Sequence, residues 1–128
     1  MTEKLNKLKV LLEEQLGLEL AILIGSQAIG NATVFSDWDI AIRWQKKIEP
    51  MQRLGKTETL RRLIAKQLNQ PEEKIDLVDL ITAGLTMKAV VAEEGIILKG
   101  EESLAWNYFL QRTWRELEIF YWNKNYAT

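Results

Sequence analysis

Residues 18–44 read LELAILIGSQAIGNATVFSDWDIAIRW, and this is the most informative stretch of the chain. Residues 18–24 form a short apolar run that ends at a glycine, which is typical of a buried β-strand. From residue 37 to residue 44, acidic or polar side chains alternate with apolar ones, which indicates a half-buried strand. The residues between these runs are polar and contain glycine, so we expect a loop or a short helix over 26–36.

The second strand opens with two aspartates, Asp37 and Asp39. On a strand, residues i and i+2 face the same side and lie about 6.6 Å apart. Trp38, Ile40 and Ile42 should then face the opposite, packed side, while both carboxylates share one exposed face. Magnesium prefers oxygen ligands and usually takes one or two carboxylates plus substrate phosphates. The pair therefore predicts a site where metal ions assist the displacement of one oxygen by another.

A phosphate site is predicted at the end of the first strand. Gly25 lets the backbone turn and come close to a ligand, and Ser26 offers an N–H and a hydroxyl to phosphate oxygens. A helix start at this point would also favour an anion. The other common phosphate motifs are absent: Gly25 and Gly30 have P-loop spacing, but Asn31 and Ala32 stand where Lys and Ser or Thr are needed, and G-x-G-x-x-G does not occur.

The composition sets outer limits on fold and chemistry. The chain has 128 residues, 47% of them hydrophobic and 27% charged, which suits a single globular domain over 1–128. Its net charge of −1 argues against general nucleic-acid or membrane binding. It has no cysteine and no histidine, so thiol, Ser-His-Asp and zinc chemistry are excluded. No apolar run is long enough to span a bilayer and no signal peptide is visible, so we expect a cytoplasmic protein.

Helices and strands alternate along the rest of the chain. The fold class expected from this order is α/β (α+β), with a small mixed sheet packed by helices and a long C-terminal helix. From apolar spacing, capping residues and glycine stops, we predict helices over 3–16, 57–69, 82–94 and 101–124, and further strands over 74–81 and 96–99.

The stretch GSQAIGNATVFSDWDIAI resembles the GSx10DxD signature of DNA polymerase β-type nucleotidyltransferases. More narrowly, it resembles the minimal nucleotidyltransferase (MNT, MntA-like) antitoxins that are paired with HEPN-domain toxins. The resemblance implies that Gly25 and Ser26 hold a nucleoside triphosphate. It also implies that Asp37 and Asp39 bind two magnesium ions.

The family uses a third acid from a later strand, which completes the metal site and helps to deprotonate the acceptor hydroxyl. Here that strand contains KIDLVD, residues 74–79. Asp76 fits best, because family members tend to have an acid directly after the first apolar residue of this strand. Asp79 has the opposite strand parity and is the alternative.

The resemblance also implies a reaction and a partner. ATP would be the donor, and a tyrosine hydroxyl on a HEPN ribonuclease would be the acceptor. Addition of one or more AMP groups would inactivate that toxin and make this chain its antitoxin. Two alternatives stay open: a nucleotidyltransferase for a small substrate such as an aminoglycoside, and a non-catalytic module that neutralises its partner by covering it.

One departure from the family concerns positive charge. Many relatives carry arginines in the loop after Gly-Ser, where this chain has Gln27 and Ile29. The charge that opposes the triphosphate must then come from Arg43, Lys46 or Lys47, or from the metal ions alone.

The last 25 residues are rich in aromatic side chains. Because a helix buries only part of its circumference, some of them should be exposed and form a surface for a partner or for a second copy of the chain. The side chains expected to form the buried stripe are Leu104, Tyr108, Leu110, Trp114, Leu117 and Tyr121.

Overall fold

A computed structural model of the chain describes residues 2–126 and confirms the α/β fold class, with a small mixed sheet, helices packed on it and a long C-terminal helix. In chain order the elements are α1 (Thr2–Glu13), β1 (Leu18–Ile24), α2 (Ser26–Ile29), β2 (Trp38–Trp44), α3 (Pro50–Leu68), the 3₁₀ turn η1 (Glu72–Lys74), β3 (Ile75–Asp79), α4 (Leu85–Glu94), β4 (Ile96–Lys99) and α5 (Leu104–Tyr126).

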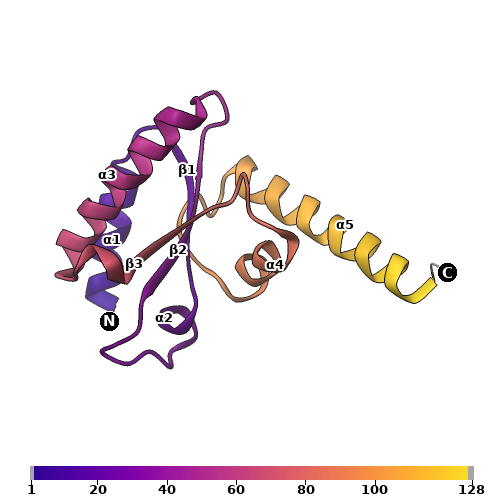
Figure 1. Cartoon of the computed structure of the whole chain (residues 1–128), viewed down its shortest axis with the longest axis horizontal. Helices are drawn as coiled ribbons and strands as arrows, with labels where there is room; N and C mark the ends of the chain where they lie inside the picture. Colours follow the sequence, from indigo (N-terminus) through magenta and orange to yellow (C-terminus); the bar gives the residue numbers. More distant parts are fainter. Residues whose placement is uncertain (1, 127–128) are drawn as a thin grey trace.

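The strands form one sheet in the order β3-β2-β1-β4. β1 pairs antiparallel with both β2 and β4, whereas β2 and β3 are parallel and are connected through α3. Because β1 runs opposite to β2 and β3, its C-terminal end lies beside the N-terminal ends of those two strands (Figure 1). Three different segments of the chain therefore meet at one end of the sheet, where β1 ends and β2 and β3 begin.

One face of the sheet is covered by α1 and α3. Trp38, Ile40 and Ile42 of β2 are buried in this layer together with apolar residues of both helices. The packed side predicted for these three residues is thus confirmed. Trp44 closes the same layer, and its indole Nε1 donates a hydrogen bond to the Thr57 hydroxyl at 3.0 Å.

The opposite face of the sheet is covered by α4 and by the first half of α5. Ile22 and Ala41 lie there against Val91 of α4 and against Trp106 and Phe109 of α5. The two aromatic rings stack with their centroids 5.4 Å apart. Neither Asp37 nor Asp39 belongs to this packed layer: Asp37 is exposed and Asp39 is half-buried.

Helix α3 begins at Pro50, seven residues before the predicted start at Thr57. Proline is well placed in the first turn of a helix because its fixed φ is helical and its missing N–H is not needed there. Thr57 lies inside the helix and does not cap it, and its hydroxyl accepts the hydrogen bond from Trp44. The helix ends as predicted at Asn69, which has a left-handed φ of 55°.

Other predicted boundaries were off by a few residues. Helix α1 ends at Glu13, so Leu16 lies in the following turn and is 86% exposed rather than buried. Strand β3 is limited to Ile75–Asp79, and α4 starts only after Gly84.

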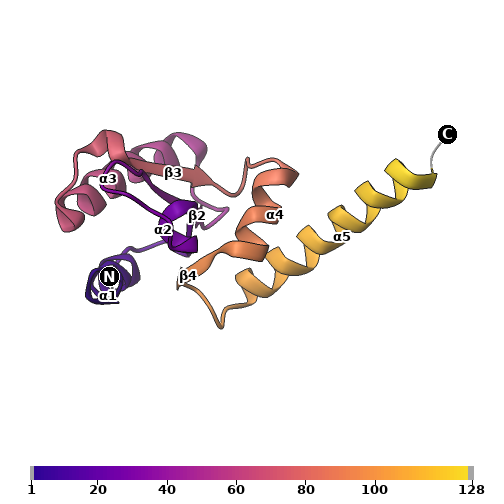
Figure 2. The same cartoon turned by 90° about the horizontal axis from the view of Figure 1, so that it is seen from below.

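The predicted buried stripe of α5 is wrong for most of its residues, although Leu110 is partly buried against the core. The buried residues of this helix are Trp106, Phe109 and Thr113, whereas Tyr108 and Trp114 are exposed. The prediction assumed that the whole helix packs on the sheet, but its C-terminal half extends away from the other elements (Figures 1 and 2). The exposed side chains of this half include Ile119, Phe120, Tyr121, Trp122 and Tyr126.

No helix within residues 2–126 combines the length and the apolar character needed to cross a bilayer.

Gly95, between α4 and β4, packs closely against the sheet. A Cβ at this position would clash with the Ile22 side chain and would lie 2.6 Å from the carbonyl oxygen of Val91. Gly95→Ala is therefore expected to lower the free energy of unfolding by about 1–3 kcal/mol, measured by urea denaturation. Gly55, within α3, has no atom within 4 Å of such a Cβ. Gly55→Ala should instead raise the free energy of unfolding by about 0.5–1 kcal/mol, and equal effects of the two changes would refute close packing at Gly95.

Candidate active site

Asp39 and Asp76 lie side by side at the edge of the sheet where β2 and β3 begin. The parallel register of the two strands pairs Asp39 directly with Asp76. Both residues alternate with side chains of the α1–α3 layer, so their side chains leave the sheet on the other face. The structure thus brings together two of the three predicted acids from segments 37 residues apart in the sequence.

Gly25 lies against the carboxylate of Asp39. Ile24, the last residue of β1, is the register partner of Asp39, and the chain then turns at Gly25 with φ 74° and ψ −159°. A Cβ at Gly25 would lie 2.5 Å from Oδ2 of Asp39. Glycine is therefore needed here both for its left-handed φ and for the absence of a side chain. Ser26 follows at once and begins the short helix α2.

Asp37 comes just before β2 and has a 54% exposed side chain. Its Oδ1 lies 3.7 Å from Nζ of Lys74, and this ammonium also donates a hydrogen bond to the Phe35 carbonyl at 2.7 Å. Lys74 thus ties the segment before Asp37 to the start of β3. Sequence reasoning missed Lys74, although its position two residues before Asp76 was a signal that it would reach the site.

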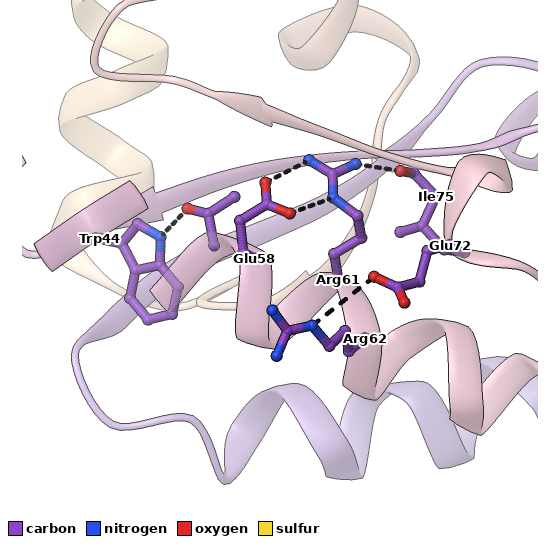
Figure 3. Close-up of polar contacts among 7 residues, drawn as sticks. Trp44, Glu58, Arg61, Arg62, Glu72 and Ile75 are labelled. Carbon is purple, nitrogen blue, oxygen red and sulfur yellow. Dashed lines mark hydrogen bonds and ion pairs between the residues drawn. The ribbon is translucent and has the colours of Figure 1, made fainter. Parts of the chain in front are cut away.

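The start of β3 is held in place by α3. The guanidinium of Arg61 pairs with the Glu58 carboxylate and donates a hydrogen bond to the carbonyl of Ile75 (Figure 3). Nearby, Arg62 pairs with Glu72 in η1 at 3.9 Å. Because Ile75 directly precedes Asp76, Arg61 fixes the strand position from which the Asp76 carboxylate projects. The sequence showed Arg61 only as a charged residue of an amphipathic helix.

The remaining candidates lie elsewhere. Asp79 is at the far end of β3, opposite Ile42, where its Oδ1 accepts a hydrogen bond from the N–H of Ile81 at 2.9 Å. Arg43 pairs with Glu19 at 3.5 Å, and it lines, together with Lys46, a separate cavity at that same end of the sheet. Neither cation lies beside the acids, and Lys47 is exposed in the turn that follows β2.

The cluster of acids disfavours ionisation of Asp39. Burial is the largest cause that raises the pKa of its carboxyl group above the ordinary value of 3.8. The negative charges of Asp76 and Asp37 and a side-chain hydrogen bond with Asp76 raise this pKa further. A half-buried carboxyl group with two acidic neighbours is an arrangement in which a bound cation would restore the ionised form.

The acids suit magnesium that is partly held by substrate. Within residues 2–126, no three acidic side chains already converge with the spacing of a complete metal site. Magnesium does not require such a cage, because it commonly binds one or two carboxylates and completes its shell with water and substrate phosphates. Asp39 and Asp76 in register, with Asp37 beside them, supply only oxygen ligands and therefore fit this ion.

The raised pKa of Asp39 predicts an effect on stability. The folded state favours the protonated carboxyl, so this contribution to stability is present below pH 3.8 and is lost as the pH rises through the higher folded-state pKa. In metal-free buffer, Asp39→Asn should therefore raise the melting temperature at pH 7, with a smaller rise as the pH falls toward 4. Thermal melts with a chelator test this, and a lower melting temperature at pH 7 would contradict it.

Residues 6–103 match the family described as Polymerase beta, Nucleotidyltransferase. Because this match covers most of the chain and includes Gly25, Ser26 and all three acids, the chain belongs to the polymerase β nucleotidyltransferase family. A search of curated protein sequences gives no significant match.

Solved structures similar to this chain come from toxin–antitoxin systems. A crystal structure of a toxin–antitoxin with AMP-PNP has a chain that is 26% identical, with a TM-score of 0.69 over 91% of this chain and 88% of that one. A structure of a tri-AMPylated HEPN toxin of Shewanella oneidensis in complex with its MNT antitoxin has a chain that is 24% identical, with a TM-score of 0.65 over 93% of this chain and 87% of that one. A structure of the toxin–antitoxin MntA–HepT has a chain that is 24% identical, with a TM-score of 0.66 over 94% of this chain and 89% of that one. At 24% identity the last two show a shared fold alone, whereas the first, at 26%, agrees with the resemblance to nucleotidyltransferases of toxin–antitoxin systems.

Proposed function

We propose that the chain is a protein adenylyltransferase antitoxin, which transfers AMP from ATP to a tyrosine hydroxyl of a cognate HEPN ribonuclease toxin and so neutralises it. The observation that carries this proposal is the meeting of Asp39, Asp76 and the Gly25 turn at one edge of the sheet. Family membership supplies the reaction class. The similar structures support the donor and the partner, because one contains AMP-PNP and another a tri-AMPylated HEPN toxin.

The turn at Gly25 would hold the triphosphate. Ser26 and Gln27 open α2, so their backbone N–H groups have no acceptor within that helix, and Ser26 adds its hydroxyl. A phosphate chain bound at this turn would lie next to Asp39, because even a Cβ on Gly25 would touch that carboxylate. Lys74, which pairs with Asp37, is placed to offer positive charge where the loop itself has the uncharged Gln27 and Ile29.

Asp37, Asp39 and Asp76 would hold two magnesium ions together with oxygens of the triphosphate. When bound, the ions neutralise the phosphate oxygens and stabilise the charge on the entering and leaving oxygens. The protein's own contribution is to hold the carboxylates of Asp39 and Asp76 side by side against their mutual repulsion, with Asp37 just before β2. It does so through the paired strands β2 and β3 and through the anchoring of β3 by Arg61.

In the proposed reaction the tyrosine oxygen forms a bond to the α-phosphorus of ATP. The bond from the α-phosphorus to the oxygen bridging to the β-phosphate breaks, and pyrophosphate leaves with that electron pair. Asp76 accepts the phenolic proton, since its carboxylate is exposed to an incoming acceptor and lies beside Asp39. Most of the acceleration would come from positioning and from stabilisation of charge.

The exposed end of α5 is our candidate for the surface that binds the toxin. Phe120 and Trp122 are 50% and 63% exposed on a part of the helix that extends away from the sheet (Figure 2). Aromatic side chains of this kind commonly provide the central contacts of protein interfaces. A HEPN toxin is the proposed occupant, because the similar structures are toxin–antitoxin structures.

Removal of these aromatic rings should weaken toxin binding. We expect the double variant Phe120→Ala and Trp122→Ala to raise the Kd for the HEPN partner by about 30-fold or more, which corresponds to about 2 kcal/mol. The melting temperature should hardly change, since both side chains lie on the surface. Isothermal titration calorimetry measures the Kd, with Asn123→Ala as the control on the same exposed stretch. An unchanged Kd would exclude this surface, and loss of a homodimer instead would assign it to a second copy of the chain.

The proposed function is tested by incubation of the chain with magnesium, α-labelled ATP and the HEPN protein encoded beside it. Label on that protein, with an intact-mass gain of one or more AMP units, supports the proposal. Label only on small molecules would favour a small-substrate transferase. Toxin neutralisation with no label transferred, and retained in Asp39→Asn, would favour an antitoxin that acts by binding alone.

A further inference from the structure

A second cavity lies at the end of the sheet opposite to Gly25 and the acids. It is open to solvent, has a volume of about 170 Å³ and is lined by residues from the end of β2 and the turn after it, the segment after β3, and helices α4 and α5; its lining residues Lys46 and Arg112 are exposed. Asp39 and Arg43 lie on the same strand four residues apart, which places the cavity about 13 Å from the acids along β2. None of the residues in the proposed reaction lines it.

The lining of this cavity is strongly cationic. Four cations and one carboxylate line it, so it has a formal surplus of three positive charges in a chain whose net charge is −1. Lys88 is neutralised by the carboxylate of Glu116 at 3.1 Å, and Arg43 is paired with Glu19 at 3.5 Å. Within residues 2–126, the other two cations, Lys46 and Arg112, form no ion pair. The cavity therefore keeps positive charge that no described acid balances.

Thr113 gives the second, independent indication of a ligand. This residue lines the cavity from α5, is only 1% exposed, and its hydroxyl has no hydrogen-bond partner within the described part of the chain. A buried hydroxyl without a partner is costly, and in native proteins such a group usually has an unseen partner such as a water or an ion. Thr113 directly follows Arg112, one of the two unpaired cations that line the cavity, so an oxyanion bound there is a candidate partner for this hydroxyl.

We propose that this cavity binds a small oxyanion of the phosphate class. Arg43, Lys46 and Arg112 would offer charge-assisted hydrogen bonds, and Thr113 its hydroxyl. The volume is below the 300–1,000 Å³ typical of pockets for drug-sized ligands, so phosphate or pyrophosphate fits better than a whole nucleotide. Because β2 and α5 both line the cavity, a bound anion would hold α5 against the sheet. The concentration of the anion would then affect how firmly the helix with the exposed aromatic surface is positioned.

The binding of phosphate and of pyrophosphate is measured separately by calorimetry and thermal melts on the full chain, in phosphate-free buffer with a chelator and no nucleotide. Arg112→Gln and Thr113→Val are the test variants. Arg115→Gln is the matched control, because Arg115 is an exposed arginine of the same helix that does not line the cavity. Ser26→Ala reports on any anion held at the Gly25 turn.

We expect saturable binding of at least one of the two anions, weakened about tenfold or more in Arg112→Gln and Thr113→Val and unchanged in Arg115→Gln and Ser26→Ala. Thr113→Val should melt at the same or a higher temperature without anion, which separates loss of the site from loss of the fold. No binding of either anion, or equal binding in Arg112→Gln and Arg115→Gln, would overturn the proposal. Because no ATP or toxin is present, either outcome leaves the proposed AMP transfer untouched.

Discussion

Asp39→Asn is expected to lower the rate of AMP transfer to the HEPN partner by about 10²–10³-fold or more. Asp39 is the acid that contacts the other parts of the site, since it pairs with Asp76 in register and faces the backbone of Gly25. Asparagine keeps the shape of the side chain but removes the negative charge that a magnesium ion would need. The rate is measured from the intact mass of the toxin over time, at saturating magnesium and ATP.

The matched control is Asp79→Asn, which changes an acid of β3 at the other end of the strand. Asparagine can still accept the hydrogen bond from the N–H of Ile81, so this variant should keep both its fold and its transfer rate. The same change at Asp39 should leave the melting temperature of the metal-free protein unchanged or raise it. Equal rates for the two variants, or a loss of rate explained by unfolding of Asp39→Asn, would contradict the assignment.

Gly25→Ala is expected to prevent ATP binding and to lower the rate of AMP transfer about as much as Asp39→Asn does. A methyl group at this position would lie 2.5 Å from Oδ2 of Asp39 and would force either the turn or the carboxylate to move. The backbone has φ 74°, a conformation that costs a residue other than glycine about 1–3 kcal/mol. The chain would thus lose its phosphate turn and the position of one acid together.

Gly30→Ala separates these two effects. Gly30 also has a left-handed φ, 85°, but a Cβ there would meet nothing within 4 Å. We therefore expect Gly30→Ala, whose backbone is in the αL region, to lower the free energy of unfolding in urea by about 1–2 kcal/mol while ATP binding stays within a few fold of wild type. Equal loss of ATP binding in both variants would mean that loop strain, rather than contact with Asp39, explains the effect.

The sequence was informative where chemistry and local pattern coincide. Leu18–Ile24 is apolar except for Glu19 and lies in the interior of the sheet, so a strand could be recognised from its composition. The alternation that starts at Asp37 identified both the strand and the face to which Trp38 and Ile40 point. Asp76 was preferred over Asp79 because members of the resembling family tend to have an acid directly after the first apolar residue of this strand, and the register of β2 with β3 places Asp76 opposite Asp39.

What could not be predicted depends on contacts between distant segments. The ammonium of Lys74 reaches Asp37 only because η1 leads into a strand that is parallel to β2, and local sequence does not define that pairing. Arg61 looks like any exposed helical arginine until α3 is packed beside the carbonyl of Ile75. The buried residues of α5 were predicted incorrectly because the spacing of apolar residues along a helix does not show where the helix extends beyond the sheet on which it packs.

The central claim is that the three acids and the Gly25 turn form one site for magnesium and a nucleoside triphosphate. Its most direct test is equilibrium binding of a non-hydrolysable ATP analogue to wild-type protein and to Asp39→Asn, each with magnesium and with a chelator. We expect binding that requires magnesium and is lost in Asp39→Asn. Binding of equal strength without magnesium, or unchanged binding in Asp39→Asn, would contradict it.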